Sequence, residues 1–292
     1  MPVDIPNNPG TQVSFPSMEL DSDAELPSVR ILEASHNRFA LYDGFDAGPL
    51  EDPGSLALVL GRHDEFALDG LLQLLPPSEG GACRMVIHNV DGSRSEACGN
   101  GLRCVAKLAV ELGRVEGPRF EIETDAGTRQ AEVQLEAGRI VGARVSMGHP
   151  RLVEKERLFG LREGEVSCTI VDMGNPHCIL FLPDLDAAPV ASIGEQLEDH
   201  PAFPERTNVE FVDARKDRLL VRIWERGVGE TRSCGTGAAA AAVAAISQAR
   251  LASPVLVVTP GGELTIEWQG EELWLTGPVG EVEEIQRIAD LC

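Results

Sequence analysis

The chain carries the pattern Cys-Gly-x-Gly twice, and each copy stands in the same local context. The first copy begins at Cys98 and the second at Cys234, 136 residues later. Each follows an apolar stretch and a Gly-containing loop and opens a helix-forming run, in "RMVIHNVDGSRSEACGNGLRCVAKLAVELG" and "LLVRIWERGVGETRSCGTGAAAAAVAAISQA". Only two long units are present, whereas a solenoid needs shorter and more numerous repeats. The duplication therefore predicts two pseudo-symmetric halves.

The repeat continues after each helix as a pair of alternating stretches. Residues 120–135 and 255–270 alternate apolar and polar residues on both sides of a Gly-containing turn, which is typical of a β-hairpin. Further period-two stretches cover residues 139–147, 166–173 and 271–276. The alanine run after Cys234 is apolar on every side, and such a helix is usually buried. We therefore predict an α+β fold in which mainly antiparallel strands wrap around one central helix in each half.

The boundaries of the two halves follow from these patterns. Residues 1–28 are rich in Pro, Asp, Asn and Ser and lack a basic start or an apolar run. This composition predicts a flexible extension rather than a secretory signal. We assign residues 29–146 to the N-terminal half, with Cys98, and residues 147–276 to the C-terminal half, with Cys234. The C-terminal segment 277–292 is expected to return to the N-terminal half.

Charge and cysteine content limit the partners of this chain. The formal net charge is -22, which disfavours nucleic acid and anionic membranes because both are negatively charged. The seven cysteines are an odd number and form no CxxC pair, so neither a disulfide framework nor a structural metal site is expected. We predict a cytoplasmic protein with reduced thiols, in which five cysteines serve packing: Cys83, Cys104, Cys168, Cys178 and Cys292.

The two repeated cysteines stand where a helix can support acid–base chemistry. The first N–H groups of a helix lack intrahelical partners and carry partial positive charge, and flanking glycines let an anion approach them. The same field favours the thiolate and lowers the thiol pKa. Facing each other across a cleft, Cys98 and Cys234 would hold a carboxylate between two helix starts. One sulfur then removes an α-hydrogen while the other protonates the opposite face, which inverts the carbon.

Four motifs, taken together and in order, resemble the diaminopimelate epimerase family: "NVDGSRSEACGNGLRC", "DMGNPHC", "FPERTN" and "ERGVGETRSCGTG". The resemblance covers about residues 29 to 280. It implies an isomerase that interconverts LL- and meso-diaminopimelate for lysine and peptidoglycan synthesis, without pyridoxal phosphate or another cofactor. It also implies two pseudo-symmetric domains, each a barrel-like antiparallel sheet that encloses a helix, and assembly as a homodimer.

The resemblance assigns roles to residues of this chain. It implies that Cys98 and Cys234 are the acid–base pair, and that His177 and Glu225 support their protonation states. The expected substrate-binding residues are Asn37, Asn89, Gly99, Asn100, Asn175, Asn208, Glu225, Arg226, Gly235 and Thr236. The sequence departs from the family pattern in several places, among them the "FALDGLL" stretch around Asp69, which loses a Gly, and the tail before Ser28, which has no counterpart. "EASHNRF" replaces a Gly-x-Gly-Asn-Asp-Phe segment, and Glu283 stands near an interface aromatic of some members.

Two alternative functions stay open at this point. The changed segment around Asn37 fits a related racemase that acts on another amino acid, such as histidine or proline. Against this, "FPERTN" and Arg226 favour a substrate with a distal charged group. The changed segment and the extension also fit a non-enzymatic relative that binds an amino acid or a partner protein. A pure binding protein would not need both cysteines, His177 and Glu225.

Overall fold

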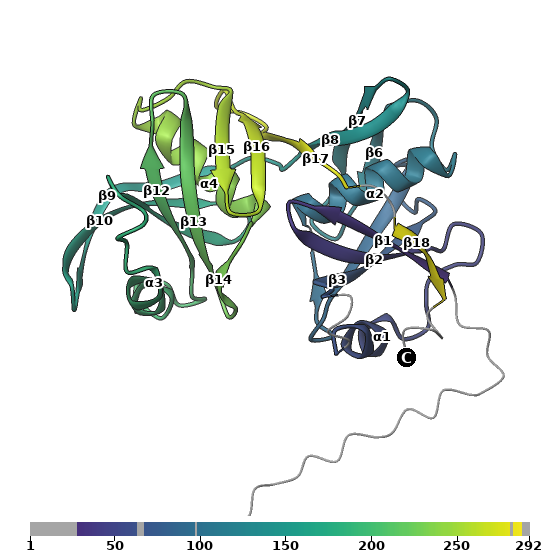
Figure 1. The fold of residues 1–292 in the computed structure, drawn as a ribbon, viewed down its shortest axis with the longest axis horizontal. Coiled ribbons are helices and arrows are strands. Elements are labelled where there is room, and N and C mark those ends of the chain that lie inside the picture. Colours follow the sequence, from purple (N-terminus) through teal and green to yellow (C-terminus); the bar gives the residue numbers. More distant parts are fainter. Residues whose placement is uncertain (1–27, 63–66, 97, 281–282, 288–292) are drawn as a thin grey trace, which may run out of the picture.

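The computed structural model describes residues 28–62, 67–96, 98–280 and 283–287, and it shows two lobes side by side (Figure 1). The expected flexible extension lies outside the described residues apart from Ser28, which begins a strand, and Cys292 also lies outside them. The strands of both lobes form one continuous sheet of 18 strands. No helix in the described part of the chain is long and apolar enough to cross a membrane.

The first lobe holds the chain up to β8 and encloses helix α2 (Figure 1). Its two helices are α1 (Pro53–Leu60) and α2 (Gly99–Glu111). Its strands are β1 (Ser28–Ala34), β2 (Asn37–Asp43), β3 (Gly70–Leu75), β4 (Cys83–Asn89), β5 (Arg94–Ser95), β6 (Arg119–Glu123), β7 (Arg129–Glu136) and β8 (Arg139–Ser146). Helix α1 lies outside the sheet, below β3 in Figure 1.

The second lobe repeats this plan around helix α4 (Figure 1). Its helices are α3 (Val190–Glu198), which lies on the outside like α1, and α4 (Gly235–Ser247). Its strands are β9 (Arg151–Leu161), β10 (Gly164–Asp172), β11 (Pro176–Phe181), β12 (Asn208–Ala214), β13 (Arg218–Glu225), β14 (Gly229–Thr231), β15 (Val255–Thr259) and β16 (Gly262–Glu267).

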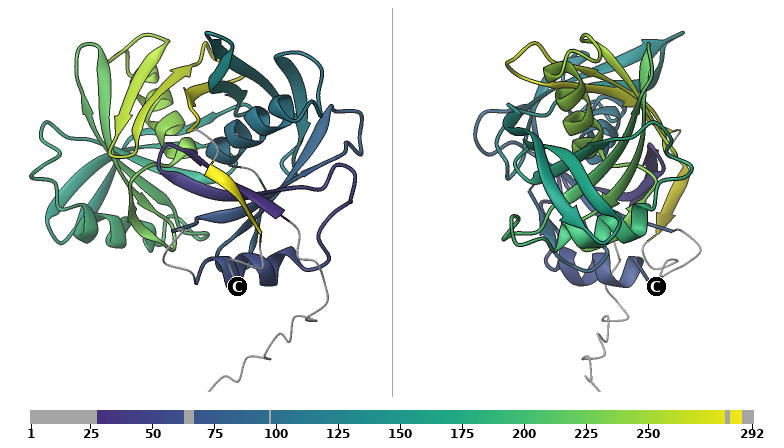
Figure 2. Two further views of the ribbon diagram at one scale, coloured as in Figure 1. Left: turned by 45° about the vertical axis from the view of Figure 1, so that its right-hand side comes forward. Right: turned by 90° about the vertical axis from the view of Figure 1, so that its left-hand side faces the viewer.

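One strand near the C-terminus connects the lobes, and the next strand pairs within the first lobe. β17 (Trp274–Pro278) pairs with β16 of the second lobe and with β8 of the first. β18 (Glu283–Arg287) then pairs antiparallel with β1 and is the yellow strand in front of the purple hairpin in Figure 2. The chain therefore returns to the first lobe after β17. The domain boundaries at residues 146 and 276 stay predictions.

The register of the strands shows the internal repeat directly. In the first lobe β4 and β5 pair Ile87 with Ser95, and in the second lobe β13 and β14 pair Ile223 with Thr231. Both partners are shifted by 136 residues, the same offset as between the two Cys-Gly-x-Gly patterns. The expected hairpins are confirmed as β6–β7 and β15–β16. Parallel pairs, such as β2–β3 and β11–β12, also occur at matching places in the two lobes.

Each lobe packs its strands around a helix that is buried over most of its length, as predicted. In α4, the eight residues from Ala238 to Ala245 are all 0% exposed. In α2, the side chains from Gly99 to Ala109 are buried. Because alanine side chains are small, strands can approach α4 closely on every side and the interior has no room for larger groups.

This packing predicts a loss of stability when the central helix is enlarged. Ala241→Leu inserts methylene groups into a fully buried site, and such overpacking typically costs about 1–3 kcal/mol of unfolding free energy. The urea midpoint should therefore fall. Ala187→Leu is the matched control, because Ala187 is exposed and its enlargement meets no packed neighbour. Equal midpoints for the two variants would contradict the packing described here.

Candidate active site

Each repeated cysteine is the N-cap residue of a central helix. Cys98 precedes α2 with φ -146° and ψ 120°, and Cys234 precedes α4 with φ -135° and ψ 121°. The Sγ of Cys98 accepts a hydrogen bond from the N–H of Gly101, and that of Cys234 accepts one from Gly237, both at 3.4 Å. Both thiols are half-buried and free. The two sulfurs thus stand in the same relation to their helices.

The first turns of α2 and α4 lie against each other. A Cβ placed on Gly235 would be 3.6 Å from the Cα of Gly99 and 3.7 Å from Oδ1 of Asn100. The Cδ1 of Leu275, from β17, lies 3.5 Å from that Cβ position and 3.7 Å from the corresponding position on Gly99. Because these two residues lack side chains, the positive ends of two helices can meet at one place.

Burial acts on both thiols against the helix field. It raises the pKa of Cys98, while the N–H groups at the start of α2 and the guanidinium of Arg103 lower it in part. Burial raises the pKa of Cys234 well above the usual range, and the negative charge of Glu225 adds to the rise. The expectation that the helix start lowers both pKa values is therefore wrong for this structure, because desolvation outweighs the helix field. The charge of Glu225 acts on both thiols, so this carboxyl lies near both of them.

Asn37 and Asn100 meet beside the first helix start. Asn100, in the first turn of α2, donates through Nδ2 to Oδ1 of Asn37 at the start of β2, and its own Oδ1 accepts from Nη2 of Arg103. In the turn before Asn37, Ser35 has φ 52° and His36 has φ 63°. This left-handed conformation is the one that glycine adopts most readily. The changed segment thus keeps a glycine-like turn without glycine.

Asn89 lies at the end of β4, the same place that Glu225 occupies at the end of β13. In the described part of the chain its side chain bonds within its own turn, where Nδ2 donates to Oγ of Ser93 at 3.0 Å. Asn89 is therefore linked to the site by its position in the repeat, which is equivalent to that of Glu225, and not by a contact with either cysteine.

His177 is fully buried in β11, and both of its ring nitrogens face oxygen atoms. Nδ1 lies 2.7 Å from Oε1 of Glu210, and Nε2 lies 3.0 Å from Oδ1 of Asn175. These two contacts hold the imidazole ring between Glu210 and Asn175. Burial raises the pKa of Glu210, and the positive charge of His177 opposes that rise.

Asn208 and Arg226 connect the loop before the second cysteine to the strands beneath it. Asn208 donates through Nδ2 to the carbonyl of Pro176 at 3.1 Å, and its Oδ1 accepts from the N–H of Arg226 at 3.0 Å. The Nη1 of Arg226 donates to the carbonyl of Glu205 at 2.8 Å. These bonds join three of the four sequence motifs at one place.

Glu225 and Thr236 lie next to the second sulfur. The carboxyl of Glu225 accepts a hydrogen bond from Thr231, and its charge acts on the thiol of Cys234. The Oγ1 of Thr236 is 3.3 Å from the Sγ of Cys234. Burial raises the pKa of Glu225, so this carboxyl can take up a proton nearer neutral pH than an exposed one. A carboxyl in this position can exchange a proton with the thiol.

The expected residues thus form two groups. One group contacts the helix starts or the side chains that adjoin them, and it comprises Cys98, Cys234, Asn37, Gly99, Asn100, Asn175, His177, Glu225, Gly235 and Thr236. The other group, Asn89, Asn208 and Arg226, bonds to loops around them. The sequence analysis missed two buried charges, Arg103 and Glu210. At the equivalent position of the other repeat, each of them is replaced by an apolar residue. An alignment of the two repeats could have revealed this difference.

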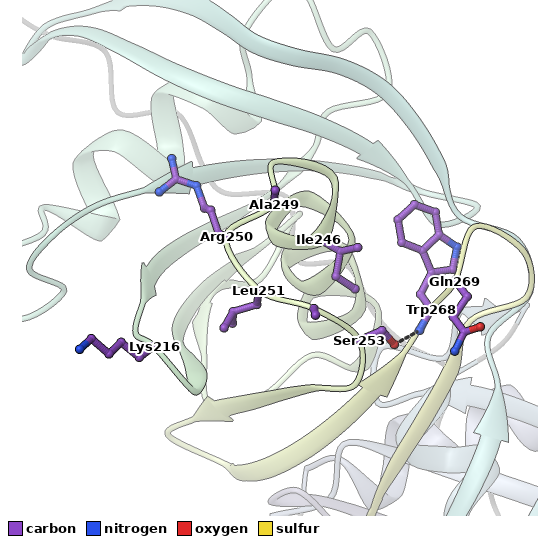
Figure 3. A pocket seen from close by; sticks show the side chains of 9 residues that line it. Lys216, Ile246, Ala249, Arg250, Leu251, Ser253, Trp268 and Gln269 are labelled. Atoms are coloured by element: carbon purple, nitrogen blue, oxygen red, sulfur yellow. Dashed lines mark hydrogen bonds between the residues drawn. The ribbon is translucent and has the colours of Figure 1, made fainter.

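A separate pocket of about 640 Å³ lies beyond the C-terminal end of α4 (Figure 3). Its apolar lining includes Ile246, Leu251 and Trp268, while Lys216 and Arg250 point outward. None of the expected site residues lines it. This pocket is therefore distinct from the junction of the two helix starts.

Comparison with known proteins agrees with this geometry. The family model described as diaminopimelate epimerase matches residues 32–153 and 169–283, which is most of the chain. The chain belongs to the diaminopimelate epimerase family. It is 43% identical over 262 residues to the diaminopimelate epimerase of Pelotomaculum thermopropionicum, covering 84% of this chain and 93% of the relative. It is also 43% identical over 250 residues to that of Moorella thermoacetica, covering 80% and 89%.

Solved structures of more distant proteins share the fold of this epimerase-family chain. A hydroxyproline epimerase from Agrobacterium vitis with bound trans-4-OH-L-proline has a TM-score of 0.67 at 16% identity, covering 89% of this chain and 92% of that one. A PhzF-family phenazine biosynthesis protein from Bacillus anthracis has a TM-score of 0.69 at 15% identity, covering 90% and 100%. At these identities the likeness concerns the fold alone, and it bears out the pseudo-symmetric architecture.

Proposed function

We propose that the chain interconverts LL- and meso-diaminopimelate by moving protons between Cys98, Cys234 and one α-carbon, without a cofactor. The observation that carries this proposal is the meeting of two helix starts, each capped by a free, half-buried thiol. Family membership supplies the substrate, since the relatives named above are diaminopimelate epimerases.

The reacting carboxylate is held by the first turns of α2 and α4. Their N–H groups, at Gly99, Asn100, Gly235 and Thr236, have no intrahelical partners and carry partial positive charge. A carboxylate in this position leaves its α-carbon between the two sulfurs. The same donors stabilise the enolate-like charge that develops when the α-hydrogen leaves, and losing one such donor typically costs about 10²–10³ in rate.

The remaining polar residues bind the other groups of the substrate. We assign Asn37, Asn89, Asn175, Asn208 and Arg226 to the ammonium groups and the distal carboxylate. A substrate with charges at both ends needs partners beyond the helix starts, and these side chains supply both donors and acceptors. Glu225 acts on Cys234 directly, and His177 acts on Glu225 and Glu210, so that both residues support the change of protonation state of the thiol.

The decisive experiment is exchange of the α-hydrogen with solvent deuterium. Incubation of the reduced protein with LL-diaminopimelate in deuterium oxide, without added cofactor, should label the α-position and yield the meso isomer. A parallel panel of L-amino acids, including histidine and proline, tests the racemase alternative suggested by the changed Asn37 segment. Turnover of one of these amino acids, without turnover of diaminopimelate, would show that the chain is a racemase of that amino acid. Tight binding without exchange would identify a non-catalytic relative.

Glu225 should contribute through proton transfer rather than through folding. Glu225→Gln keeps the shape but removes the proton-accepting group beside the thiol of Cys234, so kcat should fall about 10²-fold. Glu230→Gln is the matched control on the neighbouring strand, since Glu230 forms only a surface ion pair with Arg222. The urea midpoints of both variants should match the parent protein, and an unchanged kcat for Glu225→Gln would remove Glu225 from the mechanism.

We also propose a cytoplasmic homodimer, in line with the family resemblance. β18, which contains Glu283, pairs with β1 of the first lobe, and among the described residues no second strand pairs with it. Light scattering coupled to gel filtration measures the mass in solution. A single-chain mass at micromolar concentration would reject the dimer.

A further inference from the structure

The two cysteines have equivalent helix positions but different buried charges behind them. Five residues after Cys98, α2 carries Arg103, while five residues after Cys234, α4 carries Ala239. Both side chains are 0% exposed. The first lobe therefore places a cation inside its core, one turn below its cysteine, where the second lobe has a methyl group.

The guanidinium of Arg103 is satisfied by neutral oxygen atoms. Nη1 donates to the carbonyl of Pro278 at 2.7 Å, and Nη2 donates to Oγ of Ser35 at 2.9 Å and to Oδ1 of Asn100. Nε has no hydrogen-bond partner, and no carboxylate forms an ion pair with Arg103 in the described part of the chain. A buried cation without a counter-charge is costly, so a nearby group that can become negative is stabilised in that form.

Two thiols interact electrostatically with Arg103. The titratable groups whose charge acts on it are Cys104 and Cys98. Burial raises the pKa of Cys104 to about 12, so this thiol keeps its proton at neutral pH. Cys98 is the remaining candidate. Burial and the negative charge of Glu225 disfavour its thiolate, while Arg103 and the helix N–H groups favour it.

The charged group buried behind Cys234 is a carboxyl, whereas the one behind Cys98 is a guanidinium. In the second lobe Glu210 pairs with Ile223, and in the first lobe Leu72 pairs with Ile87, so Glu210 and Leu72 occupy equivalent positions of the repeat. A Cβ on Gly237 would lie 2.8 Å from Oε1 of Glu210, so a carboxyl approaches the first turn of α4. The corresponding neighbour in the first lobe is apolar, since a Cβ on Gly101 would lie 3.2 Å from Cδ2 of Leu72.

These carboxyls oppose ionisation of the second thiol. The negative charges of Glu225 and Glu210 both raise the pKa of Cys234, after burial. His177 offsets part of the charge of Glu210, and Asp69 from the first lobe acts in turn on Glu225. Cys234 has no buried cation in the place that Arg103 takes behind Cys98.

We propose that Arg103 is a positioning residue that makes Cys98 the more readily ionised thiol of the pair, so that in the reactive form of the pair Cys98 is the thiolate and Cys234 keeps its proton. This inference rests on the proposed function of the two cysteines as an acid–base pair. In the forward step the Cys98 thiolate takes the α-proton and becomes a thiol, and the Cys234 thiol gives its proton to the opposite face and becomes a thiolate. Arg103 then favours loss of the proton from Cys98 to solvent and uptake of one by Cys234, which restores the reactive form of the pair.

The test titrates each thiol separately. The parent protein is alkylated with iodoacetamide at a series of pH values, and mass spectrometry of the two peptides gives the midpoint for each thiol. Midpoints, unlike rates, do not depend on how accessible a sulfur is. We expect the Cys98 midpoint at least about one pH unit below that of Cys234, which is roughly a tenfold difference in thiolate ratio. Equal midpoints, or a lower one for Cys234, would overturn the proposal.

Variants of Arg103 test whether its charge causes the difference between the titration midpoints of the two thiols. Arg103→Met should raise the Cys98 midpoint by about one pH unit or more and leave that of Cys234 unchanged, whereas Arg103→Lys should keep the order of the parent protein. Lys107→Met is the matched control, because Lys107 is also buried on α2 but is paired with Glu111 at 2.6 Å. If circular dichroism shows that Arg103→Met does not fold, the parent titration and Arg103→Lys decide.

The outcomes separate this proposal from the function on which it rests. Should the Cys98 midpoint fail to move in folded Arg103→Met while both cysteines prove essential for inversion, only the role of Arg103 falls. Should a variant without Cys98 or Cys234 still invert the substrate, the two-base function falls, whatever the titration order.

Discussion

Replacing either Cys98 or Cys234 by alanine is expected to lower the rate of inversion by at least about 10⁴-fold, because each face of the α-carbon is served by only one sulfur. Each thiol caps a separate helix, and the two helices meet at Gly99 and Gly235. No second thiol in the described chain caps either helix. Water in place of a sulfur is a far weaker base than a thiolate.

The single-cysteine variants also make a stereochemical prediction. A variant with one remaining sulfur can still remove the α-hydrogen from one face and return deuterium to the same face. We therefore expect Cys98→Ala and Cys234→Ala each to exchange the α-hydrogen of one isomer only, without inversion, and the two variants to select opposite isomers. Cys104→Ala, in the buried part of α2, is the control and should retain inversion. Inversion at the parent rate in either site variant would exclude the two-base mechanism.

The fold was largely predictable from the sequence because the two halves of the chain repeat the same sequence pattern. Alternating stretches on both sides of a glycine turn gave the hairpins β6–β7 and β15–β16, which depend on local periodicity. The alanine run gave a buried helix, since no polar face was available to solvent. The parallel pairs β2–β3 and β11–β12 were not anticipated, because they join strands whose order is set by long connections rather than by local pattern.

The site was predictable in its residue types but not in its electrostatics. The cysteines, glycines and asparagines stand out by motif, and the structure gives most of them a place near the helix starts. The direction of the thiol pKa shift was wrong, because burial depends on distant segments such as β17, which no local pattern reveals. Arg103 is a charged residue that the sequence analysis did not single out, yet it is fully buried. Only the contrast between the two repeats marks Arg103 and Glu210 as special.

Oxidation is expected to inactivate the protein completely and reversibly. Hydrogen peroxide would convert the Cys98 thiolate to a sulfenic acid and release hydroxide. The thiol of Cys234 would then displace water from that sulfenic acid and form a disulfide. Both acid–base groups are lost in this product, so inversion should stop. Dithiothreitol should restore it, because exchange with an added thiol reduces the disulfide.

The location of the disulfide makes this prediction specific. Cys83, Cys104, Cys168 and Cys178 are all 1% exposed or less, so peroxide has poor access to them. Peptide mapping by mass spectrometry of the oxidised protein should therefore find Cys98 linked to Cys234 and the buried thiols free. Recovery of activity with dithiothreitol should follow the loss of this linked peptide. If peroxide leaves both site thiols free and activity unchanged, the two sulfurs do not lie close enough to act on one carbon, and the proposed mechanism loses its geometric basis. If peroxide stops inversion but the linked peptide is absent, oxidation halts at the Cys98 sulfenic acid or beyond, and the disulfide prediction alone is wrong.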